Sequence, residues 1–483
     1  MSGIPSSWVK VCFDDAIDVV SDRGHRIKQK EYLLTGQLPV VDQGEGLVAG
    51  YTNDLSAKVE SNGSVIVFGD HTRRFKFVNF PFAVGADGVK LFSPAALWSS
   101  KFLFWQLGTI NLEDRGYGRH YQHLRKEFLD LPPIAEQVRI VEKLEELLSD
   151  LETGVSELKA AQKKLAQYRQ SLLKAAVEGA LTAKWRANNK PTETGAQLLK
   201  RILQERRNRW EAKQLAKFKE QGKVPPKDWQ KKYPEPVQPD TTDLPELPQG
   251  WVWANVDQLS EVIRGASPRP AGDPRFFGGN IPWITVGSIT CDDEIYLERT
   301  EQFVTEAGKN ASRFIEVGSL LLTNSGATLG VPKISKISGC INDGSVALLD
   351  VDEVTKLYLY WFLKTQTERL RAMNQGAAQP NLNTDIVRRI HVPLCSVAEQ
   401  QEIIQIIQAT AAASKQQGDA VIRSLKQSTA QRQNILKAAF SGQLVPQDPS
   451  DEPASELLAR IRAERVKRAS VKKPLGRKTK DAA

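Results

Sequence analysis

Leucines recur every seven residues along the stretch that follows residue 135. They are Leu144, Leu151, Leu158, Leu165 and Leu172. The second apolar position of each heptad holds mostly apolar or small residues, from Ile140 to Ala175. A seam of this kind, sustained over several heptads, is typical of a helix that packs along a partner helix. The pattern predicts one continuous helix of roughly 45 residues, about 65 Å long.

Two segments of this stretch recur 263 residues later in the chain. RQSLLKAAVEGAL at residues 169–181 returns as RQNILKAAFSGQL at residues 432–444, and LPPIAEQ at 131–137 returns as LCSVAEQ at 394–400. Because both pairs share one offset, the segments between them have equal length. We therefore expect a duplicated unit and a second long helix that matches the first.

The second long helix is apolar at its start, from Ile403 to Ile407, and then turns small and polar between Ala411 and Ser428. Its candidate pairing residues are Ile403, Ile407 and Ile435. Small side chains let another helix approach closely. We therefore expect the two helices to pair as an antiparallel coiled coil, with large side chains facing small ones. The alternative is two unrelated, solvent-facing helices in different domains.

A globular segment precedes each long helix, and both segments open on a similar phrase, IPSSWV at 4–9 and LPQGWV at 247–252. Short apolar runs in the first segment predict strands of one sheet at 65–68, 75–78, 80–84 and 89–92, and a helix at 97–107. Runs in the second segment predict strands at 281–286, 319–323, 346–349 and 390–393, and a helix at 358–370. The predicted fold class is α/β (α+β) and multi-domain, with two globular domains alternating with two long helices in a pseudo-two-fold internal repeat.

These features predict six consecutive regions. They are a first globular domain (1–134), a central helical region with a long and a basic helix (135–221), a proline-rich linker (222–246), a second globular domain (247–397), a C-terminal helical region (398–465) and a basic tail (466–483). High proline density favours an extended, semi-rigid linker.

The net charge of +9 is unevenly distributed along the 483 residues. Residues 200–232 carry 12 Lys and Arg against 4 Asp and Glu, and residues 460–480 carry 10 against 1. The rest of the chain is therefore net acidic. Each basic segment follows one copy of the repeated helix. Such segments contact phosphates or remain solvated without a partner, and the sequence favours neither reading.

Composition indicates a globular protein, with 41% hydrophobic residues and ten Trp. No run of about 18 apolar residues predicts a membrane span, and the first residues do not resemble a signal peptide. The four cysteines lie far apart without a CxxC pair, so neither a disulfide framework nor a zinc site is indicated. We expect a cytoplasmic protein with no membrane partner.

Polar loops, together with residues of the strands beside them, hold the candidate DNA-binding residues. Those of the first segment are His71, Arg73, Arg74, Lys76, Tyr117, Arg119 and His120. Those of the second are Arg264, Arg269, Arg275, Asn324, Ser325, Thr328, Lys333, Gln379, Asn381 and Asn383. Asn and Gln can bond bidentately to an adenine edge, and Arg to guanine. For each residue taken singly, an ordinary role in the loop is about as good an interpretation.

Motifs for catalysis are absent from the sequence. There is no GxxxxGK[ST] loop for a nucleoside triphosphate, and no HExxH or Cys/His cluster for a catalytic metal. No Asn-Pro-Pro-Tyr/Phe tetrad, as used by amino-methyltransferases, occurs either; the NFPF at 79–82 comes closest and reads as a strand. We therefore expect no catalytic residues and no bound metal.

The arrangement resembles the specificity subunit of type I restriction–modification enzymes over essentially the whole chain. Two dissimilar globular segments are each followed by a long helix that begins near LPPxxEQ and ends near LKAAxxG. The phrases FGDHT at 68–72 and IPWI at 281–284 are also similar to ones in that family's target-recognition domains. The chain departs from the pattern at Cys395 and Ser396, where the family usually has prolines.

The resemblance implies a non-catalytic subunit that recognises double-stranded DNA. Each target-recognition domain would read one half of a bipartite site. The paired helices would set the spacer between the halves and dock two methyltransferase subunits. Those subunits would carry S-adenosylmethionine and methylate adenine, so this chain itself would bind no cofactor. Restriction and translocase subunits would complete the complex.

Two other functions fit parts of the pattern. One is a coiled-coil scaffold or protein-binding adaptor without sequence-specific DNA recognition, which does not need loops rich in Arg, Asn and Gln. The other is a DNA-binding protein that works without methyltransferase partners. A steep dependence of DNA binding on salt would separate a DNA-binding protein from a scaffold.

Overall fold

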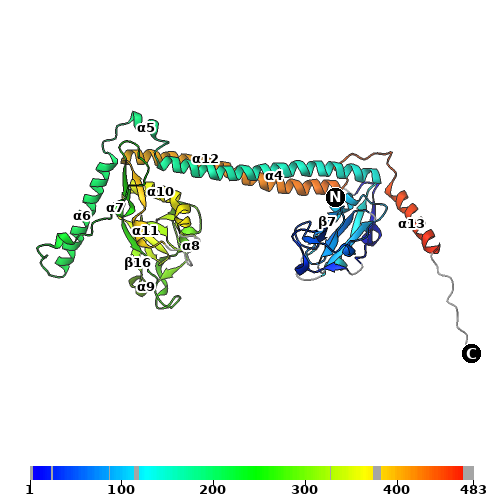
Figure 1. Cartoon of the computed structure of the whole chain (residues 1–483), viewed down its shortest axis with the longest axis horizontal. Helices are drawn as coiled ribbons and strands as arrows, with labels where there is room; N and C mark the ends of the chain where they lie inside the picture. Colours follow the sequence, from blue (N-terminus) through cyan, green and yellow to red (C-terminus); the bar gives the residue numbers. More distant parts are fainter. Residues whose placement is uncertain are drawn as a thin grey trace, which may run out of the picture. The chain divides into compact units, whose positions relative to one another are not determined.

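The computed structural model describes residues 4–22, 25–61, 63–85, 88–113, 119–326, 328–373 and 382–471. The chain divides into two compact units. Unit 1 comprises Met1–Ala160 and Val421–Ala483, and unit 2 comprises Ala161–Ala420. Each unit contains a globular domain together with parts of both long helices, which are drawn as continuous ribbons in Figure 1.

The long helices are α4 (Ile134–Val177) and α12 (Val397–Phe440), of 44 residues each. Their first and last residues differ by 263, the offset at which the sequence motifs recur. Both end in the same way, because Gly179 and Gly442 adopt positive φ angles of 78° and 70°. The next amide in each case bonds back five residues, from Ala180 to Ala175 and from Gln443 to Ala438. Glycine is favoured here because a side chain disfavours the left-handed conformation.

In unit 1 the strands form two four-stranded sheets and a two-stranded ladder. The first sheet has the order β2 (Ile17–Val19), β9 (Val89–Pro94), β6 (Val65–Gly69), β7 (Phe75–Val78). The second has the order β3 (Arg26–Ile27), β8 (Ala83–Gly85), β4 (Leu38–Val41), β5 (Gly50–Thr52). The ladder pairs β1 (Val9–Cys12) with β10 (Phe128–Leu131).

Short helices complete unit 1. They are α1 (Phe13–Ala16), η1 (Gln29–Glu31), η2 (Leu55–Ala57), α2 (Ser100–Leu107), α3 (Tyr121–Leu124) and α13 (Ala454–Val471). The predicted hairpin is confirmed, with Val65 opposite Val78 and Phe68 opposite Phe75. The predicted helix at 97–107 is confirmed from Ser100 onward.

One strand prediction in unit 1 is wrong. Residues 80–84 were expected to continue the β6–β7 sheet, but β8 pairs in parallel with β3 and β4 of the other sheet. Pro81 lies between β7 and β8, and proline has no N–H to donate to a ladder. The chain therefore leaves the first sheet at this point.

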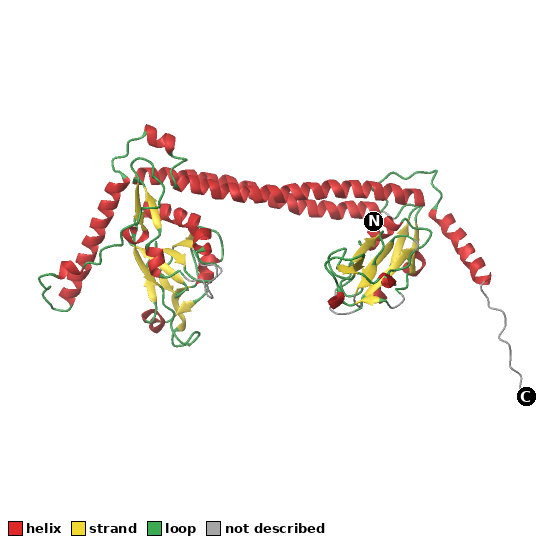
Figure 2. Ribbon diagram, in the orientation of Figure 1, coloured by secondary structure: helices red, strands yellow, loops and turns green. Residues whose placement is uncertain are grey.

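In unit 2 the strands form a five-stranded sheet, a four-stranded sheet and a ladder, drawn as yellow arrows in Figure 2. The first has the order β12 (Glu261–Arg264), β20 (Ser345–Leu349), β17 (Leu320–Thr323), β18 (Pro332–Ser335), β14 (Tyr296–Leu297). The second has the order β15 (Phe303–Val304), β13 (Phe277–Ile284), β19 (Gly339–Ile341), β16 (Arg313–Ile315). The ladder pairs β11 (Val252–Asn255) with β21 (His391–Leu394).

The remaining helices belong to unit 2. They are α5 (Ala183–Asn188), α6 (Gly195–Glu220), η3 (Trp229–Lys232), α7 (Val256–Leu259), α8 (Val286–Thr290), α9 (Glu306–Asn310), α10 (Glu353–Ala372) and α11 (Thr384–Arg388). The strands predicted at 319–323, 346–349 and 390–393 and the helix at 358–370 are confirmed. The strand predicted at 281–286 ends at Ile284, because the Thr285 hydroxyl caps α8 instead.

Both long helices contribute to the core of each unit. In unit 1, Ile140 and Leu144 of α4 lie in one buried cluster with Ile435 and Ala439 of α12. The ion pair of Glu152 with Arg432, at 3.1 Å, also joins the helices there.

In unit 2, Ala176 and Val177 of α4 share a buried cluster with Ile403 and Ile407 of α12.

The middle of α4 is less covered. The heptad leucines there are only half-buried, and Tyr168 is 58% exposed. Those leucines are Leu151, Leu158, Leu165 and Leu172.

Candidate functional site

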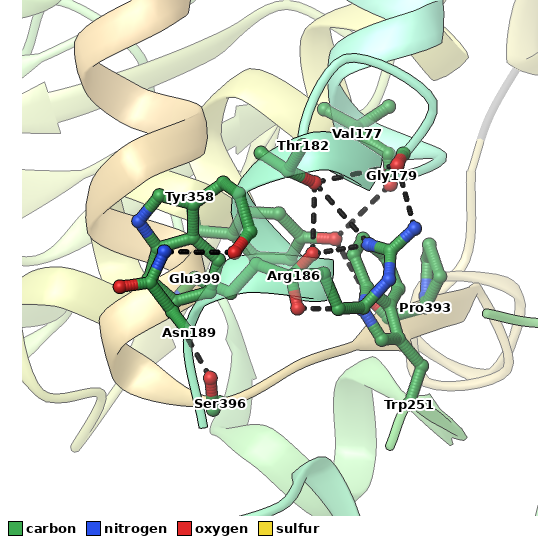
Figure 3. Close-up of polar contacts among 11 residues, drawn as sticks. Val177, Gly179, Thr182, Arg186, Asn189, Trp251, Tyr358, Pro393, Ser396 and Glu399 are labelled. Carbon is green, nitrogen blue, oxygen red and sulfur yellow. Dashed lines mark hydrogen bonds and ion pairs between the residues drawn. The ribbon is translucent and has the colours of Figure 1, made fainter. Parts of the chain in front are cut away.

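A buried glutamate organises the place where the domain of unit 2 meets the long helices (Figure 3). The Glu399 carboxylate, in the first turn of α12, is only 2% exposed. It accepts hydrogen bonds from Trp251 Nε1 at 2.9 Å and Thr182 Oγ1 at 2.8 Å, and forms an ion pair with Arg186. Trp251 precedes the first strand of the domain, whereas Thr182 and Arg186 follow α4. One carboxylate therefore ties together three distant segments.

Unit 1 has a junction built from the same kinds of element. Glu136, in the first turn of α4, accepts from Trp8 Nε1 at 3.0 Å and from Gln447 Nε2 at 2.5 Å. Beside it, Arg139 pairs with Asp451 at 2.6 Å. Because the carboxylate is buried and its nearest partners are neutral, desolvation raises the pKa of Glu136, and the hydrogen bonds from Gln447 and Trp8 oppose this rise.

Backbone pairing reinforces both junctions. The first and last strands of each domain pair with each other, β1 with β10 and β11 with β21, over four residues in each case. The next helix then starts against the domain entrance, where Ala454 N donates to Ser7 O and Gly195 N to Gly250 O. Each domain is thus held at both of its ends by helix termini, and its loops project from a rigid base.

In unit 1, two of the predicted contact loops come together around Asp70. Its backbone carbonyl accepts from the His120 amide at 3.1 Å and bonds the His120 ring nitrogen Nδ1 at 2.8 Å. Its carboxylate accepts from the Tyr121 amide at 2.7 Å. A third loop, 42–46, joins them, since Thr72 donates to the Gln43 carbonyl at 2.8 Å. The result is one cluster of three loops.

The candidates in this cluster divide into exposed and buried side chains. Arg74 and Arg119 are exposed, and Arg74 forms an ion pair of 3.4 Å with the exposed Glu45. Lys76 is buried and donates to the Gly46 carbonyl, and His120 is 1% exposed. These last two side chains hold the loops together and are not available to a ligand in this conformation.

Three other candidates of unit 1 are placed differently. Arg73 adopts a positive φ of 59° and donates to the Leu112 carbonyl at 2.9 Å. His71 is half-buried next to Gly88. Tyr117 lies outside the described residues.

In unit 2, Asp343 holds neighbouring loops together through hydrogen bonds. Its carboxylate accepts from the Ser267 hydroxyl at 2.6 Å and from Arg269 Nη2 at 3.3 Å. Its backbone carbonyl accepts from Arg264 Nε at 3.2 Å. The end of β12, with Arg264, and the proline- and glycine-rich loop that follows it, with Arg269, are therefore both fastened to the turn at 342–344. The third arginine, Arg275, is instead paired with Asp273.

A cleft of about 710 Å³ opens beside this loop. Aromatic side chains from β13 and β15, Phe277, Trp283 and Phe303, line it together with Asn342 and Asp343. Arg269 is also at its edge and is 72% exposed. An exposed guanidinium and an amide beside aromatic faces suit contact with base edges and phosphates.

A second polar turn adjoins this region. The backbone N–H of Asn324 donates to the Gly344 carbonyl at 2.9 Å, and the Asn324 side chain is fully buried. Ser325 and Thr328 are half-buried in the same turn. Asn383 caps α11 by accepting from the Ile386 amide, which accounts for it without a ligand. Gln379 and Asn381 lie outside the described residues.

Lys333 does not reach the surface. Its side chain is 1% exposed, and its ammonium pairs with Asp292. This ion pair lowers the pKa of the Asp292 carboxyl. The residue therefore has a structural role inside the domain, and a contact with DNA through it would require the pair to open.

The sequence did not indicate the two organising aspartates or the aromatic lining of the cleft. Asp343 stands in an Asn-Asp-Gly turn directly after β19, a turn signal that could have been noticed. Of the aromatic residues, only Trp283 fell in a predicted strand, and Phe277 and Phe303 fell in none. The pairing of β13 with β15 is what brings the three to one cleft.

A second hollow, of about 720 Å³, is lined by Asp292, Glu294, Glu298 and Glu301, a charge that disfavours phosphates. In the described ranges, no cluster of three or more His, Cys, Asp or Glu side chains is placed to hold a metal ion. Nor does that part of the chain contain a helix with the length and hydrophobicity needed to cross a membrane.

Comparison with known proteins places the chain beside DNA specificity subunits. A family model described as the type I restriction modification DNA specificity domain matches residues 248–422. The MjaIX specificity subunit of Methanocaldococcus jannaschii is 32% identical over 170 residues, which are 34% of this chain and 39% of that protein. The EcoDI specificity subunit of Escherichia coli is 25% identical over 398 residues, 78% of this chain and 80% of that protein. The first match thus spans well under half of its relative, whereas the second spans most of it.

Solved structures share the fold. A chain of a type I restriction–modification system superposes with a TM-score of 0.62 at 14% identity, covering 92% of this chain and all of that one. The HsdS subunit of Thermoanaerobacter tengcongensis gives a TM-score of 0.50 at 16% identity, with 91% and 98% covered. The resemblance found in the sequence is confirmed: the chain is similar to DNA specificity subunits of type I restriction enzymes, through the family model at 248–422 and through relatives that extend over most of its length.

Proposed function

We propose that each globular domain reads one half of a bipartite DNA site and that the two long helices set the spacer between the halves. The observation that carries this proposal is the pair of similar junctions. Each junction joins a domain to the start of one 44-residue helix, through Glu136 or Glu399, and to the end of the other. A helix of that length extends roughly 65 Å, about two turns of B-DNA.

Sequence reading is assigned to the loop clusters. In the first domain the exposed Arg74 and Arg119 are available to bases or phosphates. In the second, Arg264, Arg269 and Asn342 border the aromatic cleft or its loop. Arg and Asn supply the bidentate contacts that distinguish bases in the major groove. The buried Lys76, His120 and Lys333 are assigned to support of these loops.

The long helices are assigned to subunit docking as well as spacing. Leu158, Leu165 and Leu172 are half-buried and Tyr168 is exposed, so the middle of α4 presents apolar surface. We propose that the two long helices pair as an antiparallel coiled coil and that two methyltransferase subunits dock along this pair. The methyltransferase subunits carry the S-adenosylmethionine. Restriction and translocase subunits complete the assembly, and this chain contributes recognition without catalysis. The complex works on DNA in the cytoplasm.

The proposed regions follow from these roles. They are recognition domains at 1–134 and 247–397, helical regions at 135–221 and 398–465, a linker at 222–246 and a tail at 466–483. Their arrangement as a pseudo-two-fold internal repeat is supported by the constant offset of the helices and by the like construction of the two junctions.

Genome-wide sequencing of adenine methylation tests the proposal. Cells would express this chain with the methyltransferase encoded beside it, and control cells the methyltransferase alone. We expect one bipartite motif with a fixed spacer, present only in the first cells. Co-purification of the two proteins shows in parallel that the complex assembles.

The alternatives predict other outcomes. An assembled complex without new methylation would overturn DNA recognition and favour a scaffold. A continuous motif, or a spacer of variable length, would overturn the assignment of one half-site to each domain.

A further inference from the structure

The largest excess of positive charge in the described part of unit 2 lies on one arm. We define the basic arm as residues 195–233, which comprise α6 and the segment that returns along it to Tyr233. The proposed recognition of the two half-sites by the domain loops does not involve this arm. Its cations fall into two groups with different surroundings.

The arginines and Lys213 in the first part of the arm are paired with carboxylates. Arg201 pairs with Glu193 at 2.9 Å, and Arg206 with Asp257 at 3.6 Å. Farther along, Lys213 reaches Glu261 at 3.4 Å and Asp350 at 3.5 Å. Three of these partners, Asp257, Glu261 and Asp350, belong to the globular domain. The first part of the arm is thus fastened to the domain by its charges.

Cations at the free end have no such partners. The group consists of Lys217, Lys219, Lys223, Lys227 and Lys232. All five are exposed, and within the described residues none forms an ion pair with a carboxylate. Between residues 217 and 232 the acidic residues are Glu220 and Asp228, and Asp228 already pairs with Lys231 at 2.9 Å. The free end therefore carries a net positive charge.

The free end is built as a defined structure. α6 terminates at Gly222, which has a positive φ of 62°, and the Lys223 amide bonds back to the Phe218 carbonyl at 2.8 Å. The returning chain is held by Trp229, whose ring stacks on Trp210 at 5.8 Å and meets Phe218 edge-on at 6.2 Å. The backbone that carries the five lysines is therefore ordered before any partner binds, so a partner does not have to order it.

The geometry points to DNA phosphates as the partner. We propose that the five lysines contact the backbone of the duplex outside the second half-site, independently of its sequence. Figure 1 shows the free end of α6 on the same side of α12 as α9 and β16, the end of the domain whose sheet carries the aromatic cleft. Lysine is depleted at protein–protein interfaces but common in phosphate contacts.

A salt titration of DNA binding tests this inference, which rests on the proposed function. The probe is the complex of the full chain with its methyltransferase, bound to a duplex that carries the methylated motif with flanks of about 20 base pairs. One variant replaces all five lysines by Gln, and the matched control replaces the same five by Arg. Each lost phosphate contact lowers the slope of log K against log salt by about 0.9.

The expected result is a slope reduced by roughly 2 to 4 in the Gln variant, with the Arg control and the methylated motif unchanged. Trimming the flank beyond the second half-site should reduce the wild-type slope by the same amount. An unchanged slope in the Gln variant overturns the arm contact while leaving half-site reading intact. Loss of methyltransferase binding with the slope retained overturns it in favour of a protein partner. Absence of duplex binding by the wild-type complex overturns the proposed function itself.

Discussion

Glu136 and Glu399 occupy equivalent positions in the two sequence motifs, yet their buried carboxylates have different partners. Glu399 faces the guanidinium of Arg186, whereas Glu136 faces the amide of Gln447. A buried carboxylate without a cation is costly to ionise, and a buried carboxylate with one is costly to remove. The two junctions should therefore respond differently to mutation and to pH.

Glu399→Ala should loosen the junction of unit 2. The substitution leaves Trp251 Nε1, Thr182 Oγ1 and Arg186 without their buried acceptor, which costs about 3 kcal/mol. Hydrogen exchange of β11 and β21 should accelerate on the order of a hundredfold. Exchange of β1 and β10, in the other unit, is the internal control.

Glu399→Gln is the matched variant. It retains one carbonyl oxygen as an acceptor but loses the charge opposite Arg186, so its effect should be smaller than that of Ala. If exchange of β11 and β21 is equally slow in wild type and in Glu399→Ala, the carboxylate does not hold the junction.

The junction of unit 1 should weaken as the pH rises. The pKa of Glu136 is raised by burial above its ordinary value of 4.5, so the folded state favours the protonated acid. The resulting stabilisation is complete below the unfolded pKa and is lost as the pH rises through the folded pKa. The free energy of opening of β1–β10, from hydrogen exchange corrected for intrinsic rates, should fall as the pH rises above the ordinary pKa of 4.5 and level off above the raised pKa of the folded state.

Glu136→Gln should remove this dependence, because an amide does not ionise. Identical pH profiles in wild type and variant would show that burial does not govern this group. The β11–β21 ladder reports any general effect of pH on the chain.

At the level of single residues, the sequence indicated which positions are important, but it did not indicate whether each side chain is buried or exposed. The repeated Glu-Gln and Gly positions were visible as an echo. That Lys76, His120 and Lys333 are buried was not visible, because their neighbours Gly46, Asp70 and Asp292 come from distant segments.

At the scale of elements, the two long helices combine strong burial at their ends with partial exposure in the middle of α4. Leu144 is fully buried in unit 1, whereas Leu151 and Leu165 are half-buried. A heptad seam with open space on one side suits a helix that has further partners. Mutations at the half-buried leucines should therefore affect assembly before they affect folding.

Leu151→Lys combined with Leu165→Lys should disrupt both helix pairing and methyltransferase docking. Each lysine places a charge in a partly apolar contact, at a cost of about 1–2 kcal/mol. We expect the variant to remain helical by circular dichroism but to lose the methyltransferase in size-exclusion chromatography.

Ala160→Lys with Gln162→Lys is the matched control, since both positions are exposed on the same helix. It adds the same charge away from the seam and should leave assembly intact. Full assembly of the Leu151 and Leu165 variant would contradict the docking role of α4.

Elements with a strong period were predictable, and those chosen by tertiary pairing were not. The heptads of α4 and the β6–β7 hairpin follow from local pattern, because one face must be buried. The membership of β8 in a second sheet does not, because an apolar run such as Ala83-Val84 is equally suited to either sheet.

At the scale of the whole molecule, the equal lengths of α4 and α12 make a direct test of the spacing role possible. One heptad inserted in the middle of each helix lengthens both by about 10 Å and keeps the apolar seam in phase. The methylated motif should retain both half-sites and gain a spacer of about three base pairs, as read by methylation sequencing.

The control is a heptad inserted in α4 alone. It leaves the two helices unequal, so the seam and at least one junction cannot both form, and methylation should be lost. An unchanged spacer in the double insertion would show that the helices do not set the distance.

The sequence by itself indicated the resemblance to specificity subunits, the two long helices, their equal length and the positions of their ends, since these depend on periodicity and on a repeated local signal. It also indicated which polar segments hold the candidate contacts, although Lys76, Arg264 and Lys333 lie in strands. Only the tertiary structure decided which of those side chains face solvent, and which segments Asp70, Asp343, Glu136 and Glu399 hold together. The reason is physical: burial and hydrogen bonding depend on residues far apart in the chain, whereas a helix and its termination are encoded by neighbours within a few turns.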